Sequence, residues 1–277
     1  MRVLVTNDDG FDAPGLAVLG RAFADAGHDV VVVAPLTEAS GAGAGIGPVH
    51  LRGGRIPVEV VTPPGLEGIN TFAADALPAL IVIAGCLGGF GPAPDLIASG
   101  INPGRNVGRA VLHSGTVGAA LTSVHFGLKG LATSMQAGAP SGYESANGSR
   151  MHFESAASLA VELAGHLETA PPRTVLNLNV PNLPLGEILG IRHAHLATTG
   201  LIFSARVTDR EPNVQLDLRG GQGEDVTQGD DEETDDALTE LGWAVVTALT
   251  SVAEDQRREV RDLVTAFVVS ASRVVGR

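Results

Sequence analysis

The stretch that decides the fold is Val3-Leu4-Val5-Thr6-Asn7-Asp8-Asp9-Gly10, near the start of this 277-residue chain. A short apolar run that stops at polar residues and a glycine predicts a buried strand followed by a turn. Similar runs recur with helical patterns between them, which predicts a doubly wound α/β fold with a mostly parallel sheet. The predicted strands are residues 3–5, 30–34, 96–98, 131–133 and 175–178, and the predicted helices are residues 15–26, 73–84, 116–126 and 153–167.

Outside this core the pattern changes twice. Alternating segments at 49–51 and 56–61, separated by Gly53 and Gly54, predict a β-hairpin inserted in the core. After Pro184 we expect a second region, 186–277, following a first region of residues 1–185. Its predicted elements are strands at 191–196, 214–218 and 243–249 and a terminal helix at 252–269, while the acidic segment 224–236 predicts a solvated loop.

Composition excludes several classes of partner. The formal net charge is −13 and Lys129 is the only lysine, so the chain lacks the basic surface that polymeric nucleic acid or an anionic membrane requires. A single Cys86 forms no internal disulfide and suits a reducing compartment. The N-terminal carboxylates argue against a signal peptide, and Asp75 and Pro78 interrupt the most apolar stretch, 73–91. We therefore expect a cytoplasmic protein with a small-molecule substrate.

The polar loops after the predicted strands are the first place to look for a binding site. Ligands of open α/β sheets bind outside the carboxyl ends of the strands. Four polar segments fall there or just beyond, at residues 7–10, 35–47, 99–108 and 113–116. We expect all four to converge on one rim of the sheet.

The adjacent carboxylates of Asp8 and Asp9 point to a bound cation. Like charges in one site destabilise the doubly ionised form unless a cation neutralises them. Carboxylates combined with a serine hydroxyl and an asparagine amide oxygen favour magnesium, manganese or calcium over zinc or copper. An alternative remains open at this point, in which the two residues only cap the next helix or shape the turn.

Several nucleotide-binding and hydrolase motifs are absent. The glycine-rich segment 41–47 fits no G-x-G-x-x-G frame followed by a helix, and no P-loop motif occurs. A serine-hydrolase elbow is also missing, because Leu112 replaces its first glycine before His113 and Ser114. The adjacent rather than alternating carboxylates argue against an aspartyl-phosphate mechanism. Ser114-Gly115-Thr116, at the start of an apolar helix, predicts either a phosphate cradle or a simple helix cap.

Taken together and in order, these motifs resemble the SurE family of metal-dependent nucleoside monophosphate phosphatases. The resemblance spans nearly the whole chain and rests on residues 5–10, 33–41, 95–108, 113–120, 176–181 and 234–247. It implies a Rossmann-like catalytic core at 1–185, a C-terminal arm at 186–277 that serves oligomerisation, and a homodimer or homotetramer.

Family membership implies roles for particular residues. Asp8 and Asp9 match the metal-binding carboxylates, Ser40 a metal-associated serine and Asn102 an asparagine ligand. Asn106, Ser114, Gly115 and Thr116 match positions that line the phosphate pocket. The residues expected to act in catalysis are Asp8, Asp9, Asn102, Asn106 and Ser114, together with one divalent metal ion per subunit, Mg²⁺ or Mn²⁺.

The resemblance implies a phosphoric monoester hydrolase that cleaves nucleoside 5′- or 3′-monophosphates. The chain departs from the family pattern at Ala39, at Ala44 and in the loop around Phe72. An alternative is therefore a related phosphatase for a sugar phosphate or another non-nucleotide phosphomonoester. A third hypothesis is a non-catalytic nucleotide or metal sensor.

Overall fold

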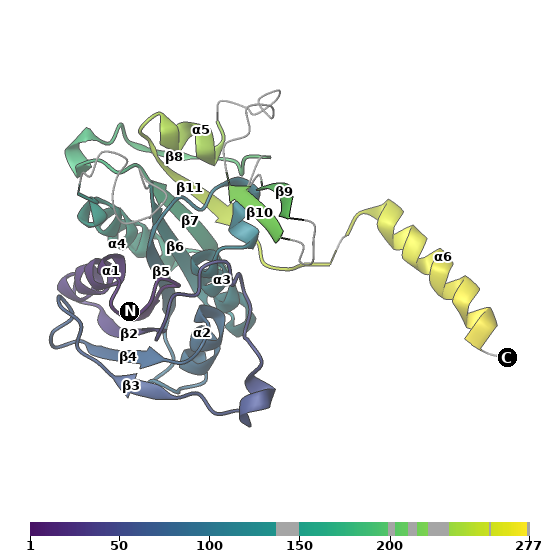
Figure 1. The fold of residues 1–277 in the computed structure, drawn as a ribbon, viewed down its shortest axis with the longest axis horizontal. Coiled ribbons are helices and arrows are strands. Elements are labelled where there is room, and N and C mark those ends of the chain that lie inside the picture. Colours follow the sequence, from purple (N-terminus) through teal and green to yellow (C-terminus); the bar gives the residue numbers. More distant parts are fainter. Residues whose placement is uncertain (137–149, 199–202, 210–214, 221–232, 255, 276–277) are drawn as a thin grey trace.

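Short apolar runs build one twisted sheet through the centre of the protein. The structure is a computed structural model that describes residues 1–136, 150–198, 203–209, 215–220, 233–254 and 256–275 (Figure 1). Within these residues the sheet has nine strands, in the order β3-β4-β2-β1-β5-β6-β7-β11-β8. The strands are β1 (Arg2–Thr6), β2 (Asp29–Pro35), β3 (Val58–Val60), β4 (Asn70–Ala74), β5 (Leu96–Pro103), β6 (Lys129–Met135), β7 (Val175–Val180), β8 (Ile191–His193) and β11 (Ala244–Leu249).

Helices cover both faces of the sheet, as the fully apolar strands require. On one face lie α1 (Pro14–Asp25) and α4 (Phe153–Thr169), and on the other lie α2 (Pro78–Cys86) and α3 (Gly115–Thr122) (Figure 1). Strand β1 shows why both faces are apolar: Val3 and Val5 pack into one core and Leu4 into the other. The parallel pairs run from β4 through β2, β1, β5 and β6 to β7, which confirms the predicted doubly wound, mostly parallel sheet.

Two predicted elements between the second and third core strands are only partly confirmed. The segment predicted as a helix at 73–84 begins with β4, and the helix starts only at Pro78, whose fixed φ suits a first helical residue. The predicted hairpin at 49–61 is also absent. Val49–Arg52 is a 3₁₀ helix, and the second predicted segment, 56–61, contains a single strand, β3, which pairs antiparallel with β4 at the sheet edge.

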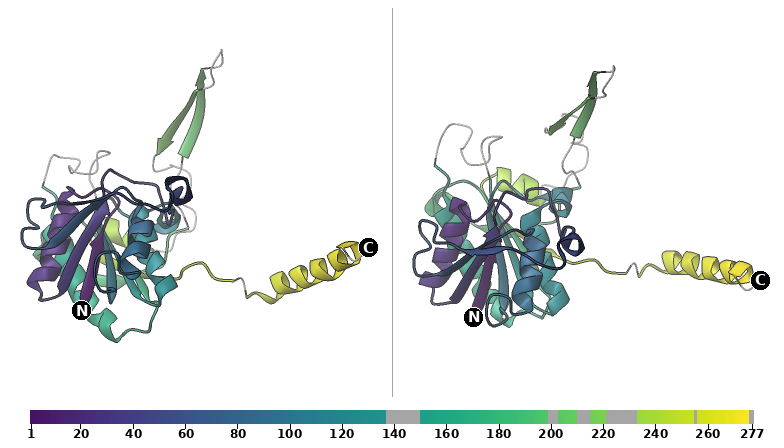
Figure 2. Two further views of the ribbon diagram at one scale, coloured as in Figure 1. Left: turned by 90° about the horizontal axis from the view of Figure 1, so that it is seen from below. Right: turned by 60° about the horizontal axis from the view of Figure 1, so that its bottom comes forward.

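Residues beyond 185 contribute both to the sheet and to projections from it. Strand β11 pairs antiparallel with β7, and β8 pairs with β11, so the sheet continues across the expected division of the chain. A separate two-stranded ribbon, β9 (Phe203–Asp209) and β10 (Gln215–Gly220), stands off the core (Figure 2). The terminal helix α6 (Arg258–Val275) starts at residue 258 rather than 252 and points away from the sheet (Figure 1).

The end of the acidic segment differs from the solvated loop that its composition predicts. Residues 224–232 of that segment lie outside the described residues. Asp235 and Asp236 begin helix α5 (Asp235–Glu240), and Asp235 is fully buried because backbone N–H groups surround its carboxylate. In the described parts of the chain, no helix is both long and apolar enough to cross a membrane.

Candidate active site

Three of the predicted site residues, Asp8, Asp9 and Asn102, lie where the order of the strands reverses. From β1 the chain moves to β2 and β4 on one side, and later to β5, β6 and β7 on the other. The carboxyl ends of β1 and β5 flank this switch point, where open α/β sheets bind ligands. Asp8 and Asp9 follow β1, and Asn102 lies near the end of β5.

Asp8 is buried against the start of α3. Its side chain is only 3% exposed, and the hydroxyl of Thr116 donates a hydrogen bond to its Oδ1. Burial raises the pKa of Asp8, while hydrogen bonds from Thr116 and from the backbone of Gly115 oppose that rise. The contact is close, since a Cβ on Gly115 would lie 2.7 Å from both Cβ and Oδ2 of Asp8. Only glycine therefore fits between this helix and the carboxylate.

Asp9 is a carboxylate whose surroundings favour a nearby positive charge. Burial raises the pKa of Asp9 to about 8, and the neighbouring charges of Asp8 and Glu38 act in the same direction. Its Oδ2 is buried and has no hydrogen-bond partner in the structure. A buried carboxylate oxygen without a partner is costly, and a bound cation would both neutralise it and supply the missing contact.

The other two predicted metal ligands are Ser40, on the loop after β2, and Asn102, near the end of β5. The backbone N–H of Ala39 donates to the Asp8 carbonyl oxygen at 2.7 Å, which holds the Ser40 loop against β1. Ser40 is exposed, and its hydroxyl donates to Glu38 at 2.8 Å. The amide nitrogen of Asn102 donates to the Gly104 carbonyl at 2.6 Å, so its oxygen is the atom left for a ligand.

This donor set fits a hard divalent cation. It offers carboxylate, amide and hydroxyl oxygens, which Mg²⁺ and Mn²⁺ accept. Among the described residues, no three His, Cys, Asp or Glu side chains gather as a metal site, so the amide of Asn102 and the hydroxyl of Ser40 would have to complete the shell.

The predicted phosphate-binding segment begins a helix, as its sequence indicates. Ser114 is the N-cap of α3, and its Oγ accepts a hydrogen bond from the N–H of Val117 at 3.1 Å. The Ser114 hydroxyl proton and the first N–H groups of α3 remain suited to an anion. Thr116 has a further contact that sequence reasoning missed, because its hydroxyl is bonded to Asp8.

Asn106 is fixed by a buried network that the sequence analysis did not identify. Its N–H donates to Asn179 Oδ1 at 2.8 Å, and its carbonyl accepts from Asn177 at 2.8 Å and Asn179 at 3.0 Å. Its own amide nitrogen donates to Ser134 Oγ at 2.9 Å. Asn177 and Asn179 are fully buried in β7. The sequence signal for this network was the pair of amide side chains inside an otherwise apolar strand, because buried polar groups need hydrogen-bond partners.

The glycine-rich segment 41–47 packs against α3. It does not lead into a helix of its own, as the glycine-rich loop of a dinucleotide-binding motif would. Gly43 N–H donates to the His113 carbonyl at 3.1 Å. A Cβ on Gly118 would lie 2.2 Å from the Gly43 carbonyl oxygen. The small residues thus allow this loop to lie directly on the helix that carries Ser114.

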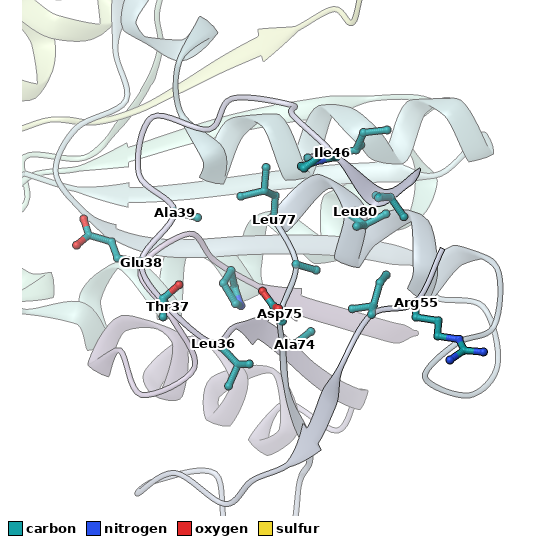
Figure 3. Close-up of a pocket in the computed structure, with 16 residues that line it drawn as sticks. Leu36, Thr37, Glu38, Ala39, Ile46, Arg55, Ala74, Asp75, Leu77 and Leu80 are labelled. Carbon is teal, nitrogen blue, oxygen red and sulfur yellow. The ribbon is translucent and has the colours of Figure 1, made fainter. Parts of the chain in front are cut away.

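A cavity of about 220 Å³ lies between the loop after β2 and the start of α2 (Figure 3). Ala39, whose N–H is bonded to Asp8, belongs to its wall. None of its 16 lining residues, all in the described part of the chain, is aromatic. Phe72 packs instead against Phe90, with ring centroids 5.4 Å apart. The labelled walls are Leu36, Thr37, Glu38, Ala39, Ile46, Arg55, Ala74, Asp75, Leu77 and Leu80 (Figure 3).

Comparison with known proteins assigns this arrangement to a family. The family model described as "Survival protein SurE" matches residues 3–201. The chain belongs to the SurE family. The 5′-nucleotidase SurE of Xanthomonas campestris pv. campestris is 38% identical to this SurE protein over 199 residues, or 71% of this chain and 70% of the relative.

Two further relatives extend the likeness towards the C-terminus. The 5′-nucleotidase SurE of Azotobacter vinelandii is 34% identical over 256 residues, covering 90% of this chain and 92% of that protein. The crystal structure of the SurE protein from Aquifex aeolicus matches with a TM-score of 0.70 and 26% identity, covering 92% of this chain and 95% of that one. Both the expected family and the α/β fold are therefore confirmed.

Proposed function

We propose that this SurE protein is a metal-dependent phosphomonoesterase that hydrolyses nucleoside 5′- or 3′-monophosphates to nucleoside and phosphate. One observation carries the proposal: the buried, unpartnered oxygen of Asp9 lies beside Asp8, which the N-terminal end of α3 contacts directly. A cation and a phosphate placed there would each meet groups of opposite charge. The relatives named 5′-nucleotidase SurE support the same activity.

The residues that would hold the metal are Asp8, Asp9, Ser40 and Asn102, with one Mg²⁺ or Mn²⁺ per subunit. A divalent ion supplies Lewis-acid polarisation of the phosphate and a lowered pKa for a coordinated water. Burial keeps Asp8 out of bulk water, and Thr116 fixes the direction of its carboxylate. Asp9, in the turn after β1, and Asn102, near the end of β5, would add further oxygen donors.

The phosphate-binding groups would be Asn106, Ser114, Gly115 and Thr116. The network around Asn106 fixes its backbone, and Ser114, as the N-cap of α3, leaves the first N–H groups of that helix for a phosphate. Fixed dipoles aimed at the equatorial oxygens stabilise the charge that spreads over them in the transition state. Positioning and electrostatics would therefore provide most of the rate acceleration.

The cavity beside Ala39 would receive the leaving nucleoside. Ala39, in its wall, donates its N–H to the Asp8 carbonyl, and the walls combine aliphatic side chains with Thr37, Glu38, Arg55 and Asp75. Such a site would recognise a base by hydrogen bonds and aliphatic contact, since aromatic stacking is missing from its lining.

The proposal is tested by hydrolysis of p-nitrophenyl phosphate with Mg²⁺ or Mn²⁺, with and without EDTA. We expect activity that EDTA abolishes and that added metal restores. Asp8→Asn should abolish it as well, whereas the matched variant Asp25→Asn should not, because Asp25 is an exposed residue of α1 whose partner is Arg21. Full activity of Asp8→Asn would contradict the proposal.

Substrate class is tested separately by comparing AMP, GMP, 3′-nucleotides and sugar phosphates. We expect the nucleotides to give the higher kcat/KM. A clear preference for sugar phosphates would favour the non-nucleotide alternative, which the relatives do not support. Binding of nucleotide without turnover would instead indicate a sensor.

We also propose that the protein is a cytoplasmic homodimer or homotetramer. The terminal helix α6 extends from the core (Figure 1) and exposes Leu263, Val264 and Val268. Apolar side chains on a projecting helix favour contact with another subunit. Light scattering coupled to gel filtration gives the subunit number, and a monomer at micromolar concentration would contradict the proposal.

A further inference from the structure

The N-terminal end of α5 is joined to the loop that carries Asn106, although 127 residues separate the two in sequence. The Asp235 carboxylate accepts hydrogen bonds from the N–H groups of Gly108 at 2.9 Å, Ala197 at 2.9 Å and Asp236 at 3.0 Å. Its side chain is fully buried. Three backbone donors on one buried side chain indicate a specific role, because burying a carboxylate is costly unless its oxygens are satisfied.

All three partners of Asp235 are donors, so the side chain must act only as an acceptor. An ionised carboxylate meets this requirement, whereas an asparagine would place an NH₂ group against an N–H. Arg105 does not pair with Asp235 but with Asp236 at 3.0 Å and Glu240 at 2.5 Å. Asp235 therefore holds the loop through backbone hydrogen bonds, while the ion pairs of Arg105 form a second, outer connection to α5.

Gly108 lies between the two parts of the proposed phosphate pocket. Two residues before it, Asn106 is held by the β7 amides, and six residues after it Ser114 caps α3. Gly108 also has a φ of 54°, in the left-handed region that favours glycine. Fixing its N–H thus sets how the chain runs from Asn106 to Ser114.

We propose that Asp235 is a positioning residue, which fixes the loop of residues 104–108 through the Gly108 N–H and so places Asn106 and Ser114 for phosphate. This inference rests on the proposed function of that pocket. The structure gives a matched control, Thr234, which caps α5 by accepting from the N–H of Ala237 at 3.4 Å and has no hydrogen bond to the loop among those of the described residues. A change at Thr234 weakens the same helix end without touching Gly108.

The test compares Asp235→Asn with Thr234→Val in the full chain loaded with Mg²⁺, by titration calorimetry with inorganic phosphate. We expect the affinity of Asp235→Asn for phosphate to fall about tenfold or more, the scale of loss that follows from misplacing binding groups by ~1 Å. Mn²⁺ affinity should stay unchanged, as Asp235 does not contact the predicted metal ligands. Thr234→Val should lower the thermal midpoint and leave phosphate affinity unchanged.

Equal loss of phosphate affinity in both variants, or no loss in Asp235→Asn, would overturn the inference. If the asparagine variant does not fold, Asp235→Ser replaces it, because it keeps one acceptor oxygen in a smaller side chain. Hydrogen exchange of the Gly108 amide separates this inference from the proposed function. If the wild type neither binds nor hydrolyses phosphate esters, the proposed function is wrong. A selective loss of Gly108 amide protection in Asp235→Asn would then still support the fixing of the loop by Asp235. Unchanged protection of the Gly108 amide would refute that fixing in either case.

Discussion

Replacing Gly115 with alanine should lower both the catalytic efficiency and the stability of the protein. The new Cβ would lie 2.7 Å from Cβ and Oδ2 of Asp8, which is 0.7 Å short of the 3.4 Å where ordinary contact begins. Because Thr116 also holds that carboxylate, Asp8 or the start of α3 must shift by a comparable distance. Overpacking of this kind costs about 1–3 kcal/mol of stability, and displacement of a reacting group by ~1 Å can cost up to about 100-fold in rate. We expect kcat/KM for p-nitrophenyl phosphate to fall about tenfold to 100-fold.

Gly165→Ala is the matched control for this substitution. Gly165 is an exposed residue of α4, and a Cβ there meets no atom within 4 Å. Alanine should stabilise that helix by about 1 kcal/mol and leave kcat/KM unchanged. Thermal unfolding and steady-state kinetics are measured on both variants with Mg²⁺. Wild-type kcat/KM in Gly115→Ala would refute the argument that the close approach of α3 positions Asp8.

Three other substitutions or measurements test the surroundings of the site. Thr116→Val removes the hydroxyl bonded to Asp8 and should cost about 1.5–3 kcal/mol of stability in chemical denaturation, the usual worth of a hydrogen bond to a charged group; an unchanged midpoint would show that the bond is not formed. Asn179→Ala removes two bonds to Asn106 and should raise KM as well as lower stability, so a normal KM would argue against Asn106 as a phosphate ligand. Burial raises the pKa of the Cys86 thiol to about 11 from 9.0, so its thiolate fraction at pH 8 is about 100-fold lower than for an ordinary cysteine. Alkylation of Cys86 by iodoacetamide should therefore accelerate about tenfold per pH unit up to about pH 11, and a plateau near pH 9 would contradict that pKa.

The core strands could be predicted from the sequence because burial on both faces leaves a continuous apolar run. Residues 3–5 and 30–34 are such runs, and both lie within strands of the observed sheet. The start of segment 73–84 was predicted as helix because alanine and leucine occur in either helices or strands. The pairing of β4 with β2 makes these first residues a strand. Tertiary contacts of this kind leave no local periodicity.

The site was predictable where function demands a local pattern, and less so where long-range contacts supply the structure. Asp8, Asp9 and the Ser114 helix start are short motifs at strand or helix ends, and the structure brings Asp8 and that helix into contact. The roles of Asn179 and Asp235 depend on partners 73 and 127 residues away. In its local sequence, Asn179 looks like any polar residue in a strand. Asp235 likewise looks like any residue of an acidic loop.

The arginine next to Asn106 does not supply a free positive charge to the proposed phosphate pocket. Arg105 directly precedes Asn106 and is the only cationic residue in the segment 99–108. In the structure its two terminal nitrogens pair with Asp236 and Glu240, which neutralises its charge at α5. The chain as a whole carries a formal net charge of −13. A phosphate dianion beside Asp8 would therefore depend on the bound cation and the N–H groups of α3 for its stabilisation, so phosphate affinity should require metal even in variants that no longer turn over.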